Sequence, residues 1–294
     1  MKSFAFGAVL FLYGSFAAPG AQEKAPRAAP EVRDDSAAEK LGWRLGVQAW
    51  TFRDRTCLEA IDTAARLGLK YIELYPGQAL SPENRGVQVG PDMGQANLEL
   101  LRARLGADRV RVLSFGVVGL SKDAAAARKI FDFARELGLE NLSAEPEPDA
   151  LDLVASLADE YGLNVAMHNH PQPSRYWNPD VVLEASKGRT KRLGSCSDTG
   201  HWMRAQFVPV EALKKLEGRV MHLHFKDLND FGEAHDVPWG TGKGDPKAMM
   251  AELKRQGFQG YLSIEYEYGN LQELAENLPK CVAFFDKTAA ELAK

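Results

Sequence analysis

Imidazole and carboxylate side chains gather in the second half of this chain. All six histidines lie between His168 and His235, and acidic residues recur through the same region, at Glu145, Glu147, Asp198, Glu265 and Glu267. A mixed nitrogen and oxygen donor set suits Mn²⁺, Mg²⁺, Co²⁺, Zn²⁺ or Fe²⁺, whereas a structural zinc site would use thiolates. The residue types therefore predict a site for one divalent metal ion of unknown identity.

The cysteines do not contribute to such a site and do not suggest a disulfide framework. Only Cys57, Cys196 and Cys281 are present, and no two of them are close in the sequence. An odd and widely spaced set argues against paired disulfides. The hydrophobic core must therefore supply the stability of the fold.

Short apolar runs alternate with amphipathic stretches along most of the chain. The expected strands are Leu45–Ala49, Tyr71–Leu74, Arg111–Phe115, Asn141–Ala144, Asn164–Met167, Leu193–Ser197, Val220–His224 and Tyr261–Ile264. The clearest expected helices are Leu58–Leu67, Ala124–Leu137, Leu151–Tyr161, Val210–Leu216, Ala248–Gln256 and a last one from Leu271 to about Leu292. This alternation predicts an α/β fold, a closed (β/α)₈ TIM barrel. A doubly wound open sheet is less suitable, because no glycine-rich phosphate loop follows the first strand.

The barrel would bring the polar residues together. Active sites of such barrels lie at the carboxyl ends of the strands, which is where these histidines and carboxylates fall. Side chains alternate along a strand, so His222 and His224 share a side, and His224 is preferred because it is nearer the strand end. On the same grounds Glu265 is preferred as a ligand, with Glu267 nearby as a supporting group or substrate contact.

Four segments at the ends of strands five to eight carry a family resemblance. They read AMHNHP, SDTGHW, HLHFKD and SIEYEY, and the chain from about Leu45 to Leu292 resembles the sugar phosphate isomerase/epimerase family with its xylose-isomerase-like barrel. The resemblance implies a divalent metal held by Asp198, His224 and Glu265, with a fourth ligand at Glu145 or His168. Ketose epimerases have a glutamate where this chain has His168, so we predict Glu145 as the first ligand and His168 as a contact or competing ligand.

A metal of this kind would activate a sugar carbonyl. Isomerisation, epimerisation and β-elimination all begin with loss of a proton next to that carbonyl and share an enediolate. The candidate bases are His168, His170, His201, Glu145 and Glu267. Lys226 is a candidate for holding a substrate oxygen or stabilising the enolate.

Aromatic residues and one loop are candidates for substrate contact. Flat faces for packing against a sugar are offered by Trp50, Tyr75, Trp177, Trp202 and Trp239, with His201 as a polar contact. The loop from Asn229 to Gly244 is polar and rich in glycine, so it could close over a substrate or bind a phosphate through backbone N–H groups. It lacks the spacing of a phosphate-binding P-loop.

Charge and the N-terminus bear on partners and location. The net charge of −4 and the pI near 5.9 give no reason to expect nucleic acid as a partner, so a small sugar or keto-glycoside is expected, with a possible homo-oligomer.

Residues 1–21 have the layout of a secretory signal peptide, which predicts export to the periplasm or outside, with no membrane association after cleavage. Residues 22–40 are expected to be a disordered linker and 41–294 the barrel domain.

Three functions follow from these expectations. The first is a metal-dependent isomerase or epimerase acting on an unphosphorylated sugar or keto-sugar. The second is a 3-keto-glycoside lyase, which would eliminate the aglycone at the same site. The third is a sugar-binding barrel without turnover, which the complete set of ligand types disfavours. An endonuclease on the same barrel is disfavoured by the acidic charge and the lack of a basic stripe.

Overall fold

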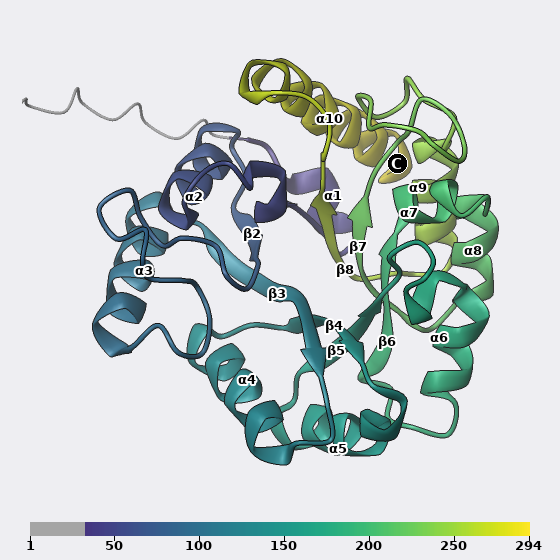
Figure 1. Cartoon of the computed structure of the whole chain (residues 1–294). Coiled ribbons are helices and arrows are strands. Elements are labelled where there is room, and N and C mark those ends of the chain that lie inside the picture. Colours follow the sequence, from purple (N-terminus) through teal and green to yellow (C-terminus); the bar gives the residue numbers. More distant parts are fainter. Residues whose placement is uncertain (1–32) are drawn as a thin grey trace, which may run out of the picture.

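Eight parallel strands close into a barrel in the computed structural model, which describes residues 33–294 (Figure 1). The strands are β1 (Trp43–Gln48), β2 (Tyr71–Leu74), β3 (Arg111–Leu120), β4 (Asn141–Pro146), β5 (Asn164–His168), β6 (Leu193–Asp198), β7 (Val220–Phe225) and β8 (Gly260–Ile264). Each strand pairs with the next in the sequence, and β1 pairs with β8. The predicted closed (β/α)₈ barrel is confirmed.

Helices follow the strands and form the outer layer. They are α1 (Ser36–Lys40), α2 (Cys57–Arg66), α3 (Gln95–Asp108), α4 (Ala124–Leu137), α5 (Leu151–Tyr161), α6 (Pro179–Ser186), α7 (Thr199–Arg204), α8 (Pro209–Lys215), α9 (Pro246–Arg255) and α10 (Leu271–Leu292). Short 3₁₀ helices occur at Ala49–Phe52, Pro148–Ala150 and Arg175–Trp177. Within the described part of the chain, none of the helices is apolar over a length that would span a membrane.

Local signals set the bounds of these helices. The side chain of Asp123 accepts hydrogen bonds from the backbone N–H groups of Ala125 and Ala126, which begins α4. Gly138 ends the same helix in the left-handed conformation, with φ of 67°, and turns the chain toward β4. At α10, Asn270 and Glu273 form a reciprocal capping box. These caps fix where α4 and α10 begin and where α4 ends.

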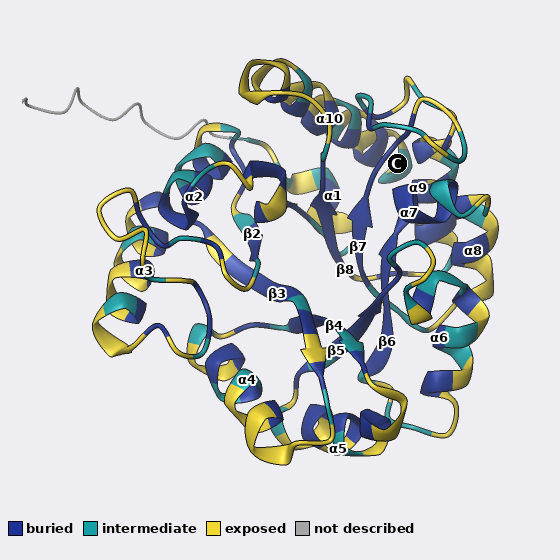
Figure 2. Ribbon diagram, viewed as in Figure 1, coloured by how far each residue is buried: buried dark blue, intermediate teal, exposed yellow. Residues whose placement is uncertain are grey.

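The strands of the barrel are mostly buried, whereas each surrounding helix exposes one face to solvent (Figure 2). β6 and β8 are buried along their whole length, most residues of the other strands are buried, and apolar residues of the outer helices cover them. The interior is not entirely apolar, since Glu73, Ser114, Ser143, His222 and Tyr261 are fully buried. The barrel therefore contains a polar region below its carboxyl-terminal edge.

The predicted linker ends earlier than expected. The signal-peptide prediction and residues 22–32 of the linker lie outside the described residues, but Ser36–Lys40 form the helix α1. The guanidinium of Arg33 contacts Asp35 at 2.5 Å and Asp286 of α10 at 2.6 Å, and its side chain is only 5% exposed. These ion pairs fix the segment to the barrel, so residues 33–40 belong to the folded domain.

Candidate metal and substrate site

Four side chains from strand ends converge at the carboxyl-terminal edge of the barrel. They are His168 of β5, Asp198 of β6, His224 of β7 and Glu265, which directly follows β8. One nitrogen or oxygen atom from each lies within 4.8 Å of the others, and all four residues are buried. The structure thus brings together three of the four predicted metal ligands and adds His168.

The distances between these atoms fit a shared cation. Nε2 of His168 lies 3.0 Å from Nδ1 of His224, and Oε2 of Glu265 lies 3.1 Å from the same Nδ1. Oδ2 of Asp198 and Oε2 of Glu265 are buried, and within residues 33–294 each has an ion pair with Lys226 at 2.9 Å but no well-directed hydrogen bond. Two imidazole nitrogens and two such oxygens are a donor set that suits a divalent ion.

Backbone contacts hold Asp198 in this position. Its Oδ1 accepts a 2.7 Å hydrogen bond from the backbone N–H of His201, which makes Asp198 the N-cap of α7. The side chain of Asn169 bonds to the backbone of Asp198 in both directions, at 2.8 Å each. One carboxylate oxygen therefore caps the helix while the other faces the site.

Glu145 lies apart from these four groups. One of its oxygens is in close contact with Nδ1 of His170, and the other accepts a 3.0 Å hydrogen bond from Ser174. Glu145 belongs to none of the ligand groups formed by the described residues. The structure places His168, and not the predicted Glu145, with the other three ligands, because the Glu145 side chain is directed toward the loop after β5.

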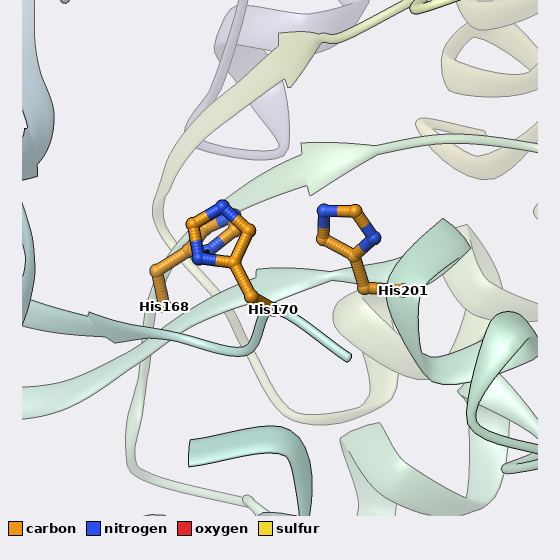
Figure 3. Close-up of side chains that lie close together, drawn as sticks. All are labelled: His168, His170 and His201. Carbon is orange, nitrogen blue, oxygen red and sulfur yellow. Dashed lines mark hydrogen bonds between the residues drawn. The ribbon is translucent and has the colours of Figure 1, made fainter. Parts of the chain in front are cut away.

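Three histidines border the site and face one another (Figure 3). The rings of His168 and His170 are 4.3 Å apart, and those of His170 and His201 are 5.3 Å apart. Because an ionised carboxylate only accepts hydrogen bonds, the contact with Glu145 places a proton on Nδ1 of His170. Nε2 of His170 has no hydrogen-bond partner among residues 33–294 and keeps its lone pair.

In His201 the proton is on the other ring nitrogen from that in His170. Its Nδ1 accepts a 3.0 Å hydrogen bond from the guanidinium of Arg204, so a neutral His201 carries its proton on Nε2. Burial and the nearby Lys226 ammonium hold the pKa of His201 well below its usual value, although Asp198 opposes them. Burial also disfavours the charged form of His170, but the hydrogen bond and charge of Glu145 outweigh it and raise its pKa. His170 is therefore the better proton acceptor of the two.

Lys226 is fully buried and does not reach the cavity. Its ammonium nitrogen lies 2.9 Å from Asp198, 2.9 Å from Glu265 and 2.6 Å from Glu267. Burial opposes its charge, but these carboxylates raise the pKa of Lys226 well above its usual value. Lys226 thus neutralises the carboxylates, and this position does not suit the predicted contact with a substrate oxygen.

Glu267 is bound by two cationic side chains, Lys226 and Arg204. Its Oε2 accepts hydrogen bonds from Lys226 at 2.6 Å and from Arg204 at 3.1 Å. Although burial raises the pKa of Glu267, the charge of Lys226 outweighs this and lowers it below its usual range. A carboxylate held in this way is a weak proton acceptor, so Glu267 fits a positioning role better than that of a base.

A cavity of about 220 Å³ opens beside the four convergent ligands. Residues of β1, of β3 and of the segments that follow β1 and β2 form one wall. Residues at or after the ends of β5, β6 and β8 form the other. The lining residues are Gln48, Trp50, Tyr75, Pro76, Gly116 and Val117 on the first wall and His168, His170, His201, Glu265 and Glu267 on the second. All of the histidines and carboxylates are on the second wall, and no lysine or arginine of the described chain lines the cavity.

Only two of the five predicted aromatic contacts line this cavity. Trp50 is 41% exposed at the rim, and its ring meets that of Tyr75 edge-on at 5.0 Å. Trp202 and Trp239 are buried in the core, where Trp239 packs on Phe225. The remaining one, Trp177, packs against Phe207 at 5.5 Å. These three tryptophans pack against other parts of the fold and do not line the cavity.

The glycine-rich loop does not offer free N–H groups to a phosphate. The carboxylate of Asp227 accepts hydrogen bonds of 2.9 Å from the backbone N–H groups of Gly240, Gly242 and Gly244. Added Cβ atoms at Gly242 or Gly244 would come within 2.5 and 3.0 Å of that carboxylate. The protein itself thus supplies the anion that this loop binds, and the expected phosphate site is not formed there.

Two residues of the site were absent from the sequence-based prediction. Glu73 of β2 lies below the metal ligands, where His224 donates to it at 2.9 Å. Gln48, at the end of β1, lines the cavity, and its amide donates to the carbonyl of Gly116 at 3.2 Å. A charged residue inside the short apolar strand Tyr71–Leu74 was a signal that could have identified Glu73.

Known proteins resemble this chain in fold and in part of the sequence. An inosose dehydratase of Geobacillus thermodenitrificans (strain NG80-2) is 25% identical over 136 residues, which cover 40% of this chain and 45% of that protein. The chain thus spans less than half the length of this relative. A solved structure from Parabacteroides distasonis ATCC 8503 is 34% identical, covers 84% of this chain and 99% of its own, and superposes with a TM-score of 0.69.

A structure described as a D-tagatose 3-epimerase-like protein shares the fold at 17% identity. It covers 85% of this chain and 99% of its own, with a TM-score of 0.65. The family model of the xylose isomerase-like TIM barrel matches residues 61–288, most of the described barrel. The chain therefore belongs to the xylose isomerase-like TIM barrel family.

Proposed function

We propose that this protein is a divalent-metal-dependent enzyme that moves a proton next to the carbonyl of an unphosphorylated sugar or keto-sugar. The observation that carries the proposal is the convergence of His168, Asp198, His224 and Glu265 beside a cavity. When bound there, a divalent metal acts as a Lewis acid on a sugar carbonyl and a neighbouring hydroxyl. The remaining chemistry belongs to residues of this chain.

His170 is the group placed to take the proton. Its Nε2 is free, it lines the cavity, and Glu145 holds the opposite nitrogen as a hydrogen-bond donor. Glu145 also stabilises the imidazolium that forms when Nε2 accepts a proton. His201, with its proton on Nε2, suits donation of a hydrogen bond to a substrate oxygen.

The distribution of acids and bases favours reactions on one face of the sugar. Epimerisation requires that a proton leave one face and return to the other, and isomerisation and β-elimination can use a single face. The wall from β1 to β3 holds no histidine or carboxylate that lines the cavity. Burial raises the pKa of Tyr75, the phenol on that wall, which makes it a poor proton donor.

The 3-keto-glycoside lyase is therefore the second candidate, and the one-sided arrangement favours it over an epimerase. Similar proteins support both candidates, since one is an inosose dehydratase and another is described as D-tagatose 3-epimerase-like. In a lyase, His170 would remove the proton next to the ketone, the C–H electron pair would form a carbon–carbon double bond as the bond to the aglycone oxygen breaks, and that oxygen would take a proton from the resulting imidazolium or from water. The released aglycone distinguishes this reaction from isomerisation.

Two features support an unphosphorylated substrate. No lysine or arginine lines the described cavity, and the N–H groups of Gly240, Gly242 and Gly244 are bound to Asp227. Phosphate recognition normally uses such groups. Export, which we propose from residues 1–21, would also expose the enzyme to free sugars and glycosides.

An assay in ²H₂O tests this proposal. The purified protein, supplied with Mn²⁺, Co²⁺ or Zn²⁺, is incubated with 3-keto-glucosides and with free ketoses, and products are followed by NMR. Release of aglycone identifies a lyase, and interconversion of ketose and aldose identifies an isomerase. A metal-loaded protein that neither turns over these sugars nor exchanges their carbon-bound protons would contradict the catalytic proposal and favour a sugar-binding barrel.

A further inference from the structure

Glu73 is an unusual residue for the interior of this barrel. It lies in the middle of β2, is fully buried, and is not among the residues that line the cavity. Its Oε2 lies 2.9 Å from Nε2 of His224 and 3.3 Å from Nε2 of His222. Its Oε1 accepts from Ser114 at 3.2 Å and is in close contact with Ser143.

We infer that Glu73 is a positioning residue that makes His224 a metal ligand through Nδ1. Two imidazole nitrogens and two hydroxyl groups surround its oxygens, and such surroundings suit an ionised carboxylate. An ionised carboxylate can only accept hydrogen bonds, so Nε2 of His224 must carry the proton. Nδ1 is then the nitrogen that faces Glu265 and His168 and is left to bind the metal. This inference rests on the proposed metal site.

The position of the Glu73 carboxylate is itself fixed. Ser114 of β3 and Ser143 of β4 hold Oε1, and the two serine hydroxyls lie 3.2 Å from each other. Oε2 is left to the two histidines of β7. Because three strands determine where this carboxylate sits, rotation of the His224 ring would break a hydrogen bond that no other described group replaces.

His168, the other ligand imidazole, has no such support. Its Nδ1 faces Nδ1 of His170 at 3.3 Å, and no carboxylate oxygen in the described chain bonds to that nitrogen. Loss of the Glu73 carboxylate should therefore act on the metal through His224 alone. Partners of this kind typically change metal affinity by about 10–100-fold when they are removed.

The first test uses the metal-free wild type. Histidine labelled with ¹⁵N reports which ring nitrogen carries the proton, and the six histidines are few enough to assign with single His→Gln variants. We expect Nε2 of His224 to carry a hydrogen-bonded proton in the wild type, and this bond to be lost in Glu73→Gln. A wild type in which Nε2 of His224 carries no proton would overturn the inference, and this result needs no variant to fold.

The second test measures metal affinity by Co²⁺ titration against a competing chelator, with the Co²⁺ absorption spectrum as a readout. We expect about 10–100-fold weaker binding for Glu73→Gln, and a smaller loss for Glu73→Asp, which keeps the charge. Ser114→Ala is the matched control, because it removes a buried partner of Glu73 and leaves the contact with His224. Equal affinities for Glu73→Gln and Ser114→Ala would overturn the inference.

A double variant separates a specific role from general damage to the core. If Glu73 acts through His224, then Glu73→Gln adds little to the loss already caused by His224→Gln. Additive losses would show an independent effect and contradict the inference. A wild type that binds no metal would instead overturn the proposed function, and the tautomer of His224 would then decide the inference about Glu73.

Discussion

Nε2 of His168 and Nδ1 of His224 lie 3.0 Å apart, although their strands, β5 and β7, are separated by β6. Two imidazole nitrogens at this distance share either a proton or a cation, because two facing lone pairs repel each other. With Nε2 of His224 directed at Glu73, Nδ1 is the nitrogen that faces His168 and Glu265. This relationship supports our proposal that His168, and not Glu145, is the fourth metal ligand.

The choice between these two residues can be measured. We expect His168→Asn to weaken metal binding by at least ~100-fold, because it removes a donor atom, and Glu145→Gln to leave the affinity nearly unchanged. Isothermal titration with Mn²⁺ or Co²⁺ gives both values. A large loss with Glu145→Gln and none with His168→Asn would restore Glu145 as the first ligand.

His170 should affect turnover without affecting the metal. The variant His170→Asn removes the free Nε2, so kcat should fall by about 10²–10⁴-fold while one metal ion per chain is retained. Glu145→Gln should lower kcat less, because the ring loses its support and keeps its lone pair. If His170→Asn turns over at the wild-type rate with metal bound, then another group is the base.

Trp50 should contribute to substrate binding at the rim. Its ring is 41% exposed and lines the cavity, so Trp50→Ala should raise KM by about 3–10-fold with little change in thermal stability. Trp177→Ala is the comparison, because Trp177 packs on Phe207 away from the cavity. The same rise in KM for both variants would contradict a specific role for Trp50.

Asp227 should stabilise the loop that follows β7. Replacement by asparagine removes the charge from three backbone hydrogen bonds and turns an amide donor toward one of the N–H groups. We expect Asp227→Asn to lower the free energy of unfolding by about 2–4 kcal/mol and to expose residues 229–244 to proteases. Asp230→Asn, on the exposed part of the same loop, serves as the control. Equal stability of the two variants would argue against this role.

Periodicity was sufficient to predict the framework of the fold. The observed bounds of β2, α4, α5 and α10 are those expected from the sequence, because apolar periodicity and capping residues agree in each segment. The short helix α7 was not predicted, since it has six residues and begins at Asp198, whose side chain also faces the site. The helix α1 was assigned to a linker because the ion pairs that hold the preceding residues, Arg33 and Asp35, to the barrel are not visible in local composition.

The sequence predicted which polar residues lie at the strand ends, but not the directions in which their side chains point. Asp198, His224 and Glu265 are held by strands or their immediate continuation, so strand alternation and the family resemblance located them. Glu145 also occupies a strand end, but its side chain turns toward His170, and a sequence does not show such a rotation. Glu73 was missed for a related reason, because its partners in β3, β4 and β7 meet only in the closed barrel.

Metal analysis of the purified protein tests the central claim most directly. The wild type and an Asp198→Asn/Glu265→Gln double variant, which keeps the size of both side chains, are compared by elemental analysis after dialysis with Mn²⁺, Co²⁺ or Zn²⁺. We predict one metal ion per wild-type chain and none in the folded double variant. A folded wild type without metal at saturating concentrations of all three ions would contradict the account.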